Sequence, residues 1–94
     1  MPQVIFTPRA LQDLERLRSF IIPKNPAAAQ RAAATIIQTI QHLSVHPEMG
    51  RLTEDSDQRE ILIEFGNTGY VARYHFDEQT VTILAIRHQK EAGY

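Results

Sequence analysis

The chain has 94 residues, of which ten are Lys or Arg and eleven are Asp or Glu, so its formal net charge at pH 7 is −1. A chain of this length builds one modest hydrophobic core, and its near-neutral charge argues against a function that rests on many phosphate contacts, so we expect a single domain over residues 1–94. The sequence has no cysteine and no run of about 20 apolar residues, which excludes disulfides, thiolate metal sites and cysteine nucleophiles and predicts a cytoplasmic protein with no membrane span.

A short strand and an amphipathic helix are predicted at the start of the chain. The sequence QVIF at positions 3–6 favours β structure. Thr7 and Pro8 then provide a helix N-cap and a proline at the first helical position. From Pro8 to about Ile21, apolar residues recur every three or four positions with charged residues between them, which is the period of a helix with one buried face.

A second helix and a long loop follow. Asn25 and Pro26 repeat the cap signal, and alanine and isoleucine on one face continue the helix to about Ser44. The link between the two helices is only about four residues long, so we expect an antiparallel helical hairpin. The stretch from 44 to 58 contains Pro, Gly and acidic residues without a period, which predicts the one long loop of the domain.

The second half predicts three antiparallel strands, at 59–65, 70–76 and 80–87, joined by connections of hairpin length. The order β-α-α-β-β-β predicts an α+β fold in which the helical hairpin packs on one face of an antiparallel sheet. Because side chains alternate along a strand, the apolar sets should face the helices. In the first two strands these sets are Ile61, Ile63, Phe65, Tyr70, Ala72, Tyr74 and Phe76.

The last strand is apolar on both sides. This pattern is typical of an interior strand that is covered on both faces. Alternation does not indicate which side Arg87 shares. The two predicted sets are Val81, Ile83 and Ala85 on one side and Thr82, Leu84 and Ile86 on the other.

Basic and aromatic residues gather near the strand ends. On the face away from the helices they could bind a phosphate and move a proton, and the alternative is a solvated sheet face, since Arg and His are common at strand ends. Glu60 and Glu64 project onto that face and would repel a phosphate. Residues 51–94 carry five basic and eight acidic side chains, a net charge of −3. The cluster comprises Arg73, His75, Arg87, His88 and Tyr94.

Other patterns do not predict a catalytic or metal site. His42 and His46 have the spacing of two ligands on a helix, but Pro47 biases His46 out of helical geometry and no third ligand is evident, so we expect neither a metal nor another cofactor. The serines lack a nucleophile-elbow context, and the glycines form no phosphate loop. Arg51 is either a loop-tip charge or a contact residue.

Taken together, the element order and the sequences NPAAAQRAAATI, HPEMGR and GYVARYHFDEQTVTILAIRHQKEAGY resemble the RelE/ParE superfamily of toxins from bacterial type II toxin–antitoxin modules. The likeness covers nearly the whole chain. It is strongest at the turn formed by Pro47, Gly50 and Arg51, at Tyr70 and Tyr74, and at ILAIRHQKEAGY. The resemblance implies a microbial RNase T1-like fold, a role in plasmid stabilisation, and a hetero-oligomer with a cognate ParD- or RelB-like antitoxin whose C-terminal segment wraps the toxin.

The superfamily divides by target. RelE-like members are ribosome-dependent mRNA endonucleases that use several basic residues, and their strand corresponding to YVARY has an arginine where this chain has Val71. ParE-like members lack that basic set and inhibit DNA gyrase by a protein contact. The missing arginine and the acidic second half therefore favour a ParE-like gyrase inhibitor without a catalytic site. We expect its contacts with target or antitoxin at Arg51, Arg87, His88 and Tyr94.

Two alternatives stay open. As a RelE-type endoribonuclease acting on mRNA at the ribosome, the chain would use Arg73, Arg87 and His88 for general acid–base chemistry and charge stabilisation. As a degenerate toxin, it would retain antitoxin binding alone.

Overall fold

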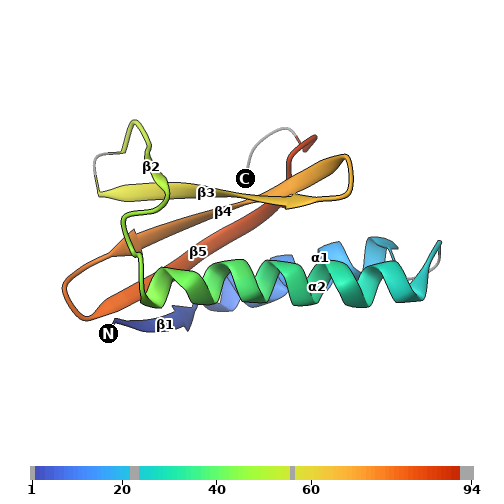
Figure 1. Cartoon of the computed structure of the whole chain (residues 1–94), viewed down its shortest axis with the longest axis horizontal. Helices are drawn as coiled ribbons and strands as arrows, with labels where there is room; N and C mark the ends of the chain where they lie inside the picture. Colours follow the sequence, from blue (N-terminus) through green and yellow to red (C-terminus); the bar gives the residue numbers. More distant parts are fainter. Residues whose placement is uncertain (1, 22–23, 56, 92–94) are drawn as a thin grey trace.

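A computed structural model describes residues 2–21, 24–55 and 57–91. The sheet order is β1-β5-β4-β3-β2, with β1 parallel to β5 and the other neighbours antiparallel. The α+β fold predicted from the sequence is confirmed (Figure 1). The elements in chain order are β1 (Gln3–Phe6), α1 (Pro8–Ile21), α2 (Pro26–Gln41), the 3-10 turn η1 (His42–Ser44), β2 (Arg51–Leu52), β3 (Gln58–Phe65), β4 (Thr68–Phe76) and β5 (Thr80–His88).

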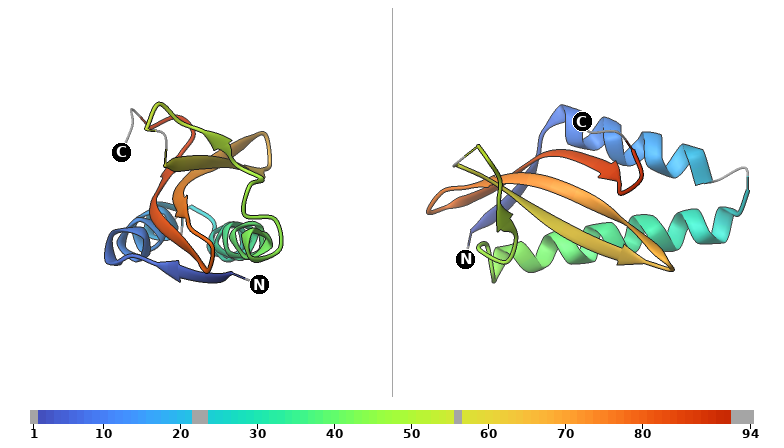
Figure 2. Two further views of the ribbon diagram at one scale, coloured as in Figure 1. Left: turned by 90° about the vertical axis from the view of Figure 1, so that its left-hand side faces the viewer. Right: turned by 90° about the horizontal axis from the view of Figure 1, so that it is seen from above.

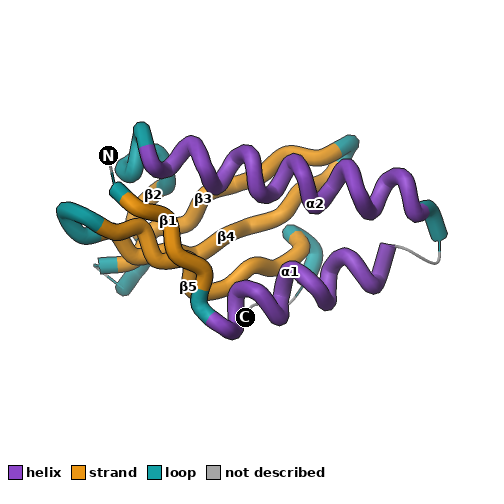
Figure 3. The backbone as a smooth tube through the Cα atoms, turned by 90° about the horizontal axis from the view of Figure 1, so that it is seen from below, coloured by secondary structure: helices purple, strands orange, loops and turns teal. Residues whose placement is uncertain are grey.

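Both helices begin at the predicted caps. The Ala10 N–H donates to Thr7 Oγ1 at 3.1 Å, and the Ala28 N–H donates to Asn25 Oδ1 at 3.0 Å, which satisfies one free N–H in each first turn. The two helices lie side by side and antiparallel, and both cover the same face of the sheet (Figure 2, Figure 3). Neither helix of the described residues is long and apolar enough to cross a membrane.

The core lies between the helices and the sheet. Tyr74, Ile36 and Ile40 are among its largest fully buried side chains, and burying an aliphatic side chain of this size stabilises a fold by about 1.5–3 kcal/mol. The alternation predicted for the first two meander strands is confirmed. Its buried members are Ile61, Ile63, Tyr70, Ala72 and Tyr74. We call the opposite surface of the sheet, away from α1 and α2, the far face.

The alternation predicted for β5 is wrong after Leu84. The register between β4 and β5 shifts in this stretch, so Leu84 is an extra residue and forms a β-bulge. Ala85 consequently lies opposite Arg73 on the far face, and Ile86 turns into the core. Arg87 comes to lie on the far face as well.

The predicted loop between 44 and 58 contains a strand that the sequence did not indicate. The two residues of β2 pair with Arg59 and Glu60 of β3 and form one edge of the sheet. Two residues are too few to show the alternation that marks a strand in a sequence. The strand forms because it pairs with β3. The loop thereby brings Arg51 beside the residues of the meander.

Candidate functional site

A turn before β2 is held by the buried hydroxyl group of Tyr74. Tyr74 Oη donates to the Pro47 carbonyl at 2.7 Å and accepts from the Gly50 N–H at 2.9 Å. A Cβ at position 50 would lie 2.6 Å from Tyr74 Oη, so the backbone approaches this closely only with glycine. Burial raises the pKa of Tyr74, which keeps the phenol protonated as a donor. The turn therefore fixes the position of Arg51.

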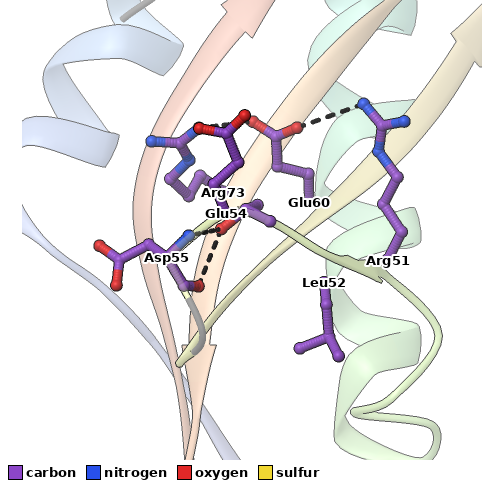
Figure 4. A pocket seen from close by; sticks show the side chains of 7 residues that line it. Arg51, Leu52, Glu54, Asp55, Glu60 and Arg73 are labelled. Atoms are coloured by element: carbon purple, nitrogen blue, oxygen red, sulfur yellow. Dashed lines mark hydrogen bonds and ion pairs between the residues drawn. The ribbon is translucent and has the colours of Figure 1, made fainter.

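Three charged side chains form a row across the far face. Strand pairing places Arg51, Glu60 and Arg73 opposite one another on β2, β3 and β4. Arg73 Nη2 donates to Glu60 Oε2 at 3.0 Å, and Arg51 Nη2 lies 3.6 Å from Glu60 Oε1 (Figure 4). The Glu60 side chain is only 10% exposed, against 34% for Arg73 and 84% for Arg51. Because water screens Arg51 most, the Arg73–Glu60 pair is the stronger interaction.

An open hollow of about 430 Å³ beside this row has more carboxyl groups than guanidinium groups in its lining. The hydrogen bond and charge of the Asp57 carboxyl raise the pKa of Asp55, which shows that acidic groups crowd this loop. Such a hollow repels a phosphate group more than it attracts one. Its charged lining residues are Arg51, Glu54, Asp55, Glu60 and Arg73.

Arg87 lies in the next row of the far face and braces the chain after β5. Its Nη1 donates to the carbonyl groups of His88, Gln89 and Glu91, each at 3.3 Å. One guanidinium group thus contacts three carbonyl groups, of residues 88, 89 and 91, in the backbone that leaves the sheet. These contacts hold the backbone after β5, residues 88–91, against the end of the strand.

His88 lies on the core side of the sheet. It pairs with Tyr70 in the ladder, and the two rings meet edge to face with centroids 5.3 Å apart. The Lys90 N–H donates to His88 Nδ1 at 3.1 Å, so in the neutral ring Nε2 carries the proton and donates it to Thr68 Oγ1 at 3.2 Å. Both ring nitrogens of His88 are therefore engaged.

Glu91 ties the same tail to α1. Its Oε1 accepts from the His88 N–H and its Oε2 accepts from Arg16 Nη1, both at 2.7 Å. Partial burial by itself would raise the pKa of Glu91, but the hydrogen bonds from His88 and Arg16 outweigh it and hold that pKa below its usual value. Asp13 Oδ2 also accepts from the Ile86 N–H at 2.9 Å, so α1 holds the end of β5 at two points.

The structure brings only part of the predicted cluster together. Arg73, His75 and Arg87 share the far face, whereas His88 lies on the core side, and Tyr94 lies outside the described residues. Neighbouring residues of a strand face opposite sides in any case, and the bulge in β5 decides that Arg87, and not His88, lies on the far face. Their roles as contacts of a target or an antitoxin stay predictions.

The ion pairs of Glu60 were missed from the sequence, which indicated only its repulsion of phosphate. A two-residue turn follows Phe65, with Gly66 at a φ of 62°, and such a turn fixes the register that sets Glu60 opposite Arg73. Counting five residues back from Phe65 and five forward from Thr68 would have predicted that Glu60 pairs with Arg73. The pair with Arg51 depends on β2, for which the sequence carries no signal.

The two histidines weighed as metal ligands lie at and beyond the end of α2. His42 is the first residue of η1, and His46 follows it in the loop. Across residues 2–21, 24–55 and 57–91, no group of three His, Cys, Asp or Glu side chains could hold a metal ion. That the chain works without a metal or another cofactor stays a prediction.

Comparisons with known proteins give a consistent group of relatives. The family model described as the ParE toxin of the type II toxin–antitoxin system parDE matches residues 4–93. Toxin RelE3 of Caulobacter vibrioides is 36% identical over 91 residues, which cover 97% of this chain and 98% of the relative. Toxin RelE2 of the same organism is 39% identical over 88 residues, which cover 94% and 96%.

Two solved structures have a similar fold. A chain of the chromosomal ParDE toxin–antitoxin system from P. aeruginosa superposes with a TM-score of 0.81 at 21% identity, covering 94% of this chain and 96% of that one. A chain of the RelBE2 toxin–antitoxin complex from Mycobacterium tuberculosis gives a TM-score of 0.64 at 26% identity, covering 95% and 100%. At this identity, the ParDE likeness concerns the fold alone.

Proposed function

Since the chain belongs to the ParE toxin family of type II toxin–antitoxin systems, within the RelE/ParE superfamily, we propose that it stops its target by binding to a protein, and that this target is DNA gyrase. Family membership makes the chain a toxin of such a system and leaves both a gyrase inhibitor and a ribosome-dependent ribonuclease open. The choice between them rests on where the basic side chains lie.

The separation of His88 from Arg73 by the sheet carries the proposal. General acid–base catalysis needs the base within about 3 Å of the proton it takes, and the charge-stabilising groups must surround the same phosphate. His88 lies on the core side with both ring nitrogens engaged, whereas Arg73 and Arg87 lie on the far face. A single RNA phosphate does not reach both sets of side chains.

The hydrogen bonds of the two arginines support the same choice. Arg73 donates to the carboxylate of Glu60, and Arg87 donates to three backbone carbonyls. Both side chains thus already have oxygen partners that a phosphate would have to replace. Arg51, at the edge of the sheet with an 84% exposed side chain, is well placed to meet a carboxylate of a partner protein.

The sharing of one face by three arginines favours a second candidate, an mRNA endoribonuclease of the RelE type. Arg51, Arg73 and Arg87 all lie on the far face, and a phosphate that displaced Glu60 would find guanidinium groups there. In this candidate His88 would first have to break its present hydrogen bonds and reach around the end of the sheet.

We also propose that a cognate antitoxin neutralises this toxin by covering apolar surface that a small core leaves exposed. Met49 and Leu62 are about half exposed and line one groove with Arg51, and Leu11 and Phe20 are exposed on α1. A segment with acidic and apolar side chains suits the groove. Saturating antitoxin should raise the Tm of the toxin, and an unchanged Tm would contradict the proposal.

The gyrase proposal is tested by titrating purified toxin into a supercoiling assay. We expect supercoiling to stop near stoichiometric toxin. Arg51→Glu reverses an exposed charge and should weaken inhibition about tenfold. The matched control is Arg18→Glu on α1, whose side chain is 52% exposed, and it should change inhibition by less than about twofold. Full supercoiling in a large excess of folded toxin would contradict the proposed function.

A further inference from the structure

Glu60 lies between the arginines of the far face. It pairs with Arg51 on one side and with Arg73 on the other. Arg51, Glu60 and Arg87 also line a wider groove of about 750 Å³, in which Glu60 is the one carboxylate among the lining residues. Glu60 and Arg51 thus border both this groove and the smaller hollow beside Arg73.

We propose that Glu60 determines which class of partner the far face accepts, because its carboxylate occupies the position that a phosphate would take between Arg51 and Arg73. Carboxylate and phosphate oxygens bind guanidinium groups with the same geometry. With Glu60 present, the face excludes nucleic acid and remains available to a protein surface. This inference rests on the proposed function, since it names the residue that directs the toxin away from RNA.

The strand holds Glu60 in place, and this gives its carboxylate an advantage over any phosphate in solution. Glu60 is directly opposite Arg73 in the ladder, and its side chain is 10% exposed, so little freedom is lost when the pair forms. A group delivered by the same chain competes at an effective concentration of about millimolar or more. A phosphodiester would have to displace it and would also face the negative charge of the nearby loop.

Exchanging Glu60 for Gln keeps the shape of the side chain and removes its charge. The amide oxygen can still accept from Arg73. Arg51 and Arg73 would then lie on either side of an uncharged group, and the wider groove beside Arg51 would have no carboxylate in its lining, which is the chemistry that binds inorganic phosphate or an RNA backbone. Glu54 and Asp55 would remain as exposed carboxylates in the lining of the smaller hollow.

The test measures binding of a fluorescent single-stranded RNA to three forms of the toxin. Glu64→Gln is the matched control, because Glu64 is an exposed residue of the same strand and face and loses the same charge. Between about 50 and 200 mM salt, we expect Glu60→Gln to bind about tenfold more tightly than wild type and to have a salt slope steeper by about one or two. Glu64→Gln should stay within about twofold of wild type.

Equal binding by Glu60→Gln and Glu64→Gln would overturn the inference, because net charge alone would then explain any gain. The gain should disappear in the double variant Glu60→Gln with Arg73→Gln, and a gain that survives there would also overturn it. Circular dichroism checks folding, and Glu60→Thr, which suits a strand, replaces a Gln variant that does not fold. A different result, mRNA cleavage by the wild-type toxin, would contradict the proposed function itself.

Discussion

The turn end and the tail end of the sheet both carry arginines that look alike in the sequence, but their guanidinium groups bind different acceptors. At the turn end, residues 47–51 with Glu60 and Arg73, the guanidinium groups of Arg51 and Arg73 meet a side-chain carboxylate beside an open hollow, while Arg59 donates to the carbonyls of Glu48 and Gly50. At the tail end, residues 87–91 with Arg16, they bind backbone carbonyls or the carboxylate that fastens the tail to α1.

This difference shows that the acceptor decides what an arginine does. An exposed guanidinium paired with a carboxylate exchanges that partner for one on another protein at little cost. A guanidinium that satisfies backbone carbonyls leaves them without a partner when it departs. Arg51 at the turn end is thus suited to contact, and Arg87 at the tail end to holding the structure together.

The largest expected effect comes from the glycine that positions the turn end. In Gly50→Ala the new methyl group would lie 2.6 Å from Tyr74 Oη and 2.8 Å from the Glu60 carbonyl oxygen, and such overpacking costs about 3 kcal/mol of unfolding free energy. Urea unfolding measures it. The control Gly66→Asn fills open space at a φ of 62°, which Asn tolerates, and should cost less than about 1 kcal/mol. Equal losses in both variants would contradict a special role for the turn.

The next largest effect is the loss of unfolding free energy when Glu60 is removed, compared with the loss when the exposed Glu64 is removed. Glu60→Ala leaves Arg73 without the carboxylate it donates to. Breaking a fully buried pair costs about 3–5 kcal/mol, and because Arg73 is 34% exposed we expect about 2 kcal/mol. Glu64→Ala should cost less than about 0.5 kcal/mol. Denaturation of the two variants in parallel gives the difference, and similar losses would mean that the pair contributes little.

At the tail end, removing the brace should have a smaller effect. Arg87→Gln shortens the side chain and removes the Nη1 donor to three carbonyls, which should cost about 1 kcal/mol and speed amide hydrogen exchange after β5. Lys90→Gln, an exposed position in the same tail, is the control and should leave exchange unchanged. Exchange that is the same in Arg87→Gln as in the wild type would show that the tail is held by other contacts.

The smallest effect is a pH dependence at the tail end. The pKa of Glu91 lies below its usual value, so its contribution to stability is present above about pH 4.3 and is lost as the pH falls through the lower pKa of the folded state. The contribution is small, because the side chain is 37% exposed and screened by water. Wild type should exceed Glu91→Gln in stability at pH 7, and the difference should shrink steadily as the pH falls below about 4. A gap that persists at low pH would rule out charge as the cause.

Local signals in the sequence were enough to predict most of the fold. Thr7 and Asn25 cap their helices as expected, because a cap depends on residues only three positions away. Alternation in β3 and β4 predicted the buried side correctly. The parallel pairing of β1 with β5 was not predicted, since it joins segments about 75 residues apart and leaves no local pattern.

The candidate site was harder to predict because small irregularities control it. The bulge at Leu84 sets Arg87 on the far face and His88 on the core side, the reverse of what unbroken alternation along β5 would give, and a single extra residue in a strand has no reliable signature in an apolar run. β2 places Arg51 beside Glu60, and its two residues are too few to show a period. The sequence thus named charged and polar groups as candidates, and the register of the strands decided which of them meet.

The central claim is that the toxin acts by protein contact and not by cleaving mRNA. The most direct test adds wild-type toxin or His88→Gln to ribosomes programmed with mRNA and maps the mRNA ends. Gln cannot act as an acid or base near neutral pH, and both proteins are first shown to be folded. The account predicts intact mRNA with either protein at concentrations of wild type that stop gyrase. Cleavage at a defined codon by the wild type, reduced about a hundredfold or more in His88→Gln, would contradict it.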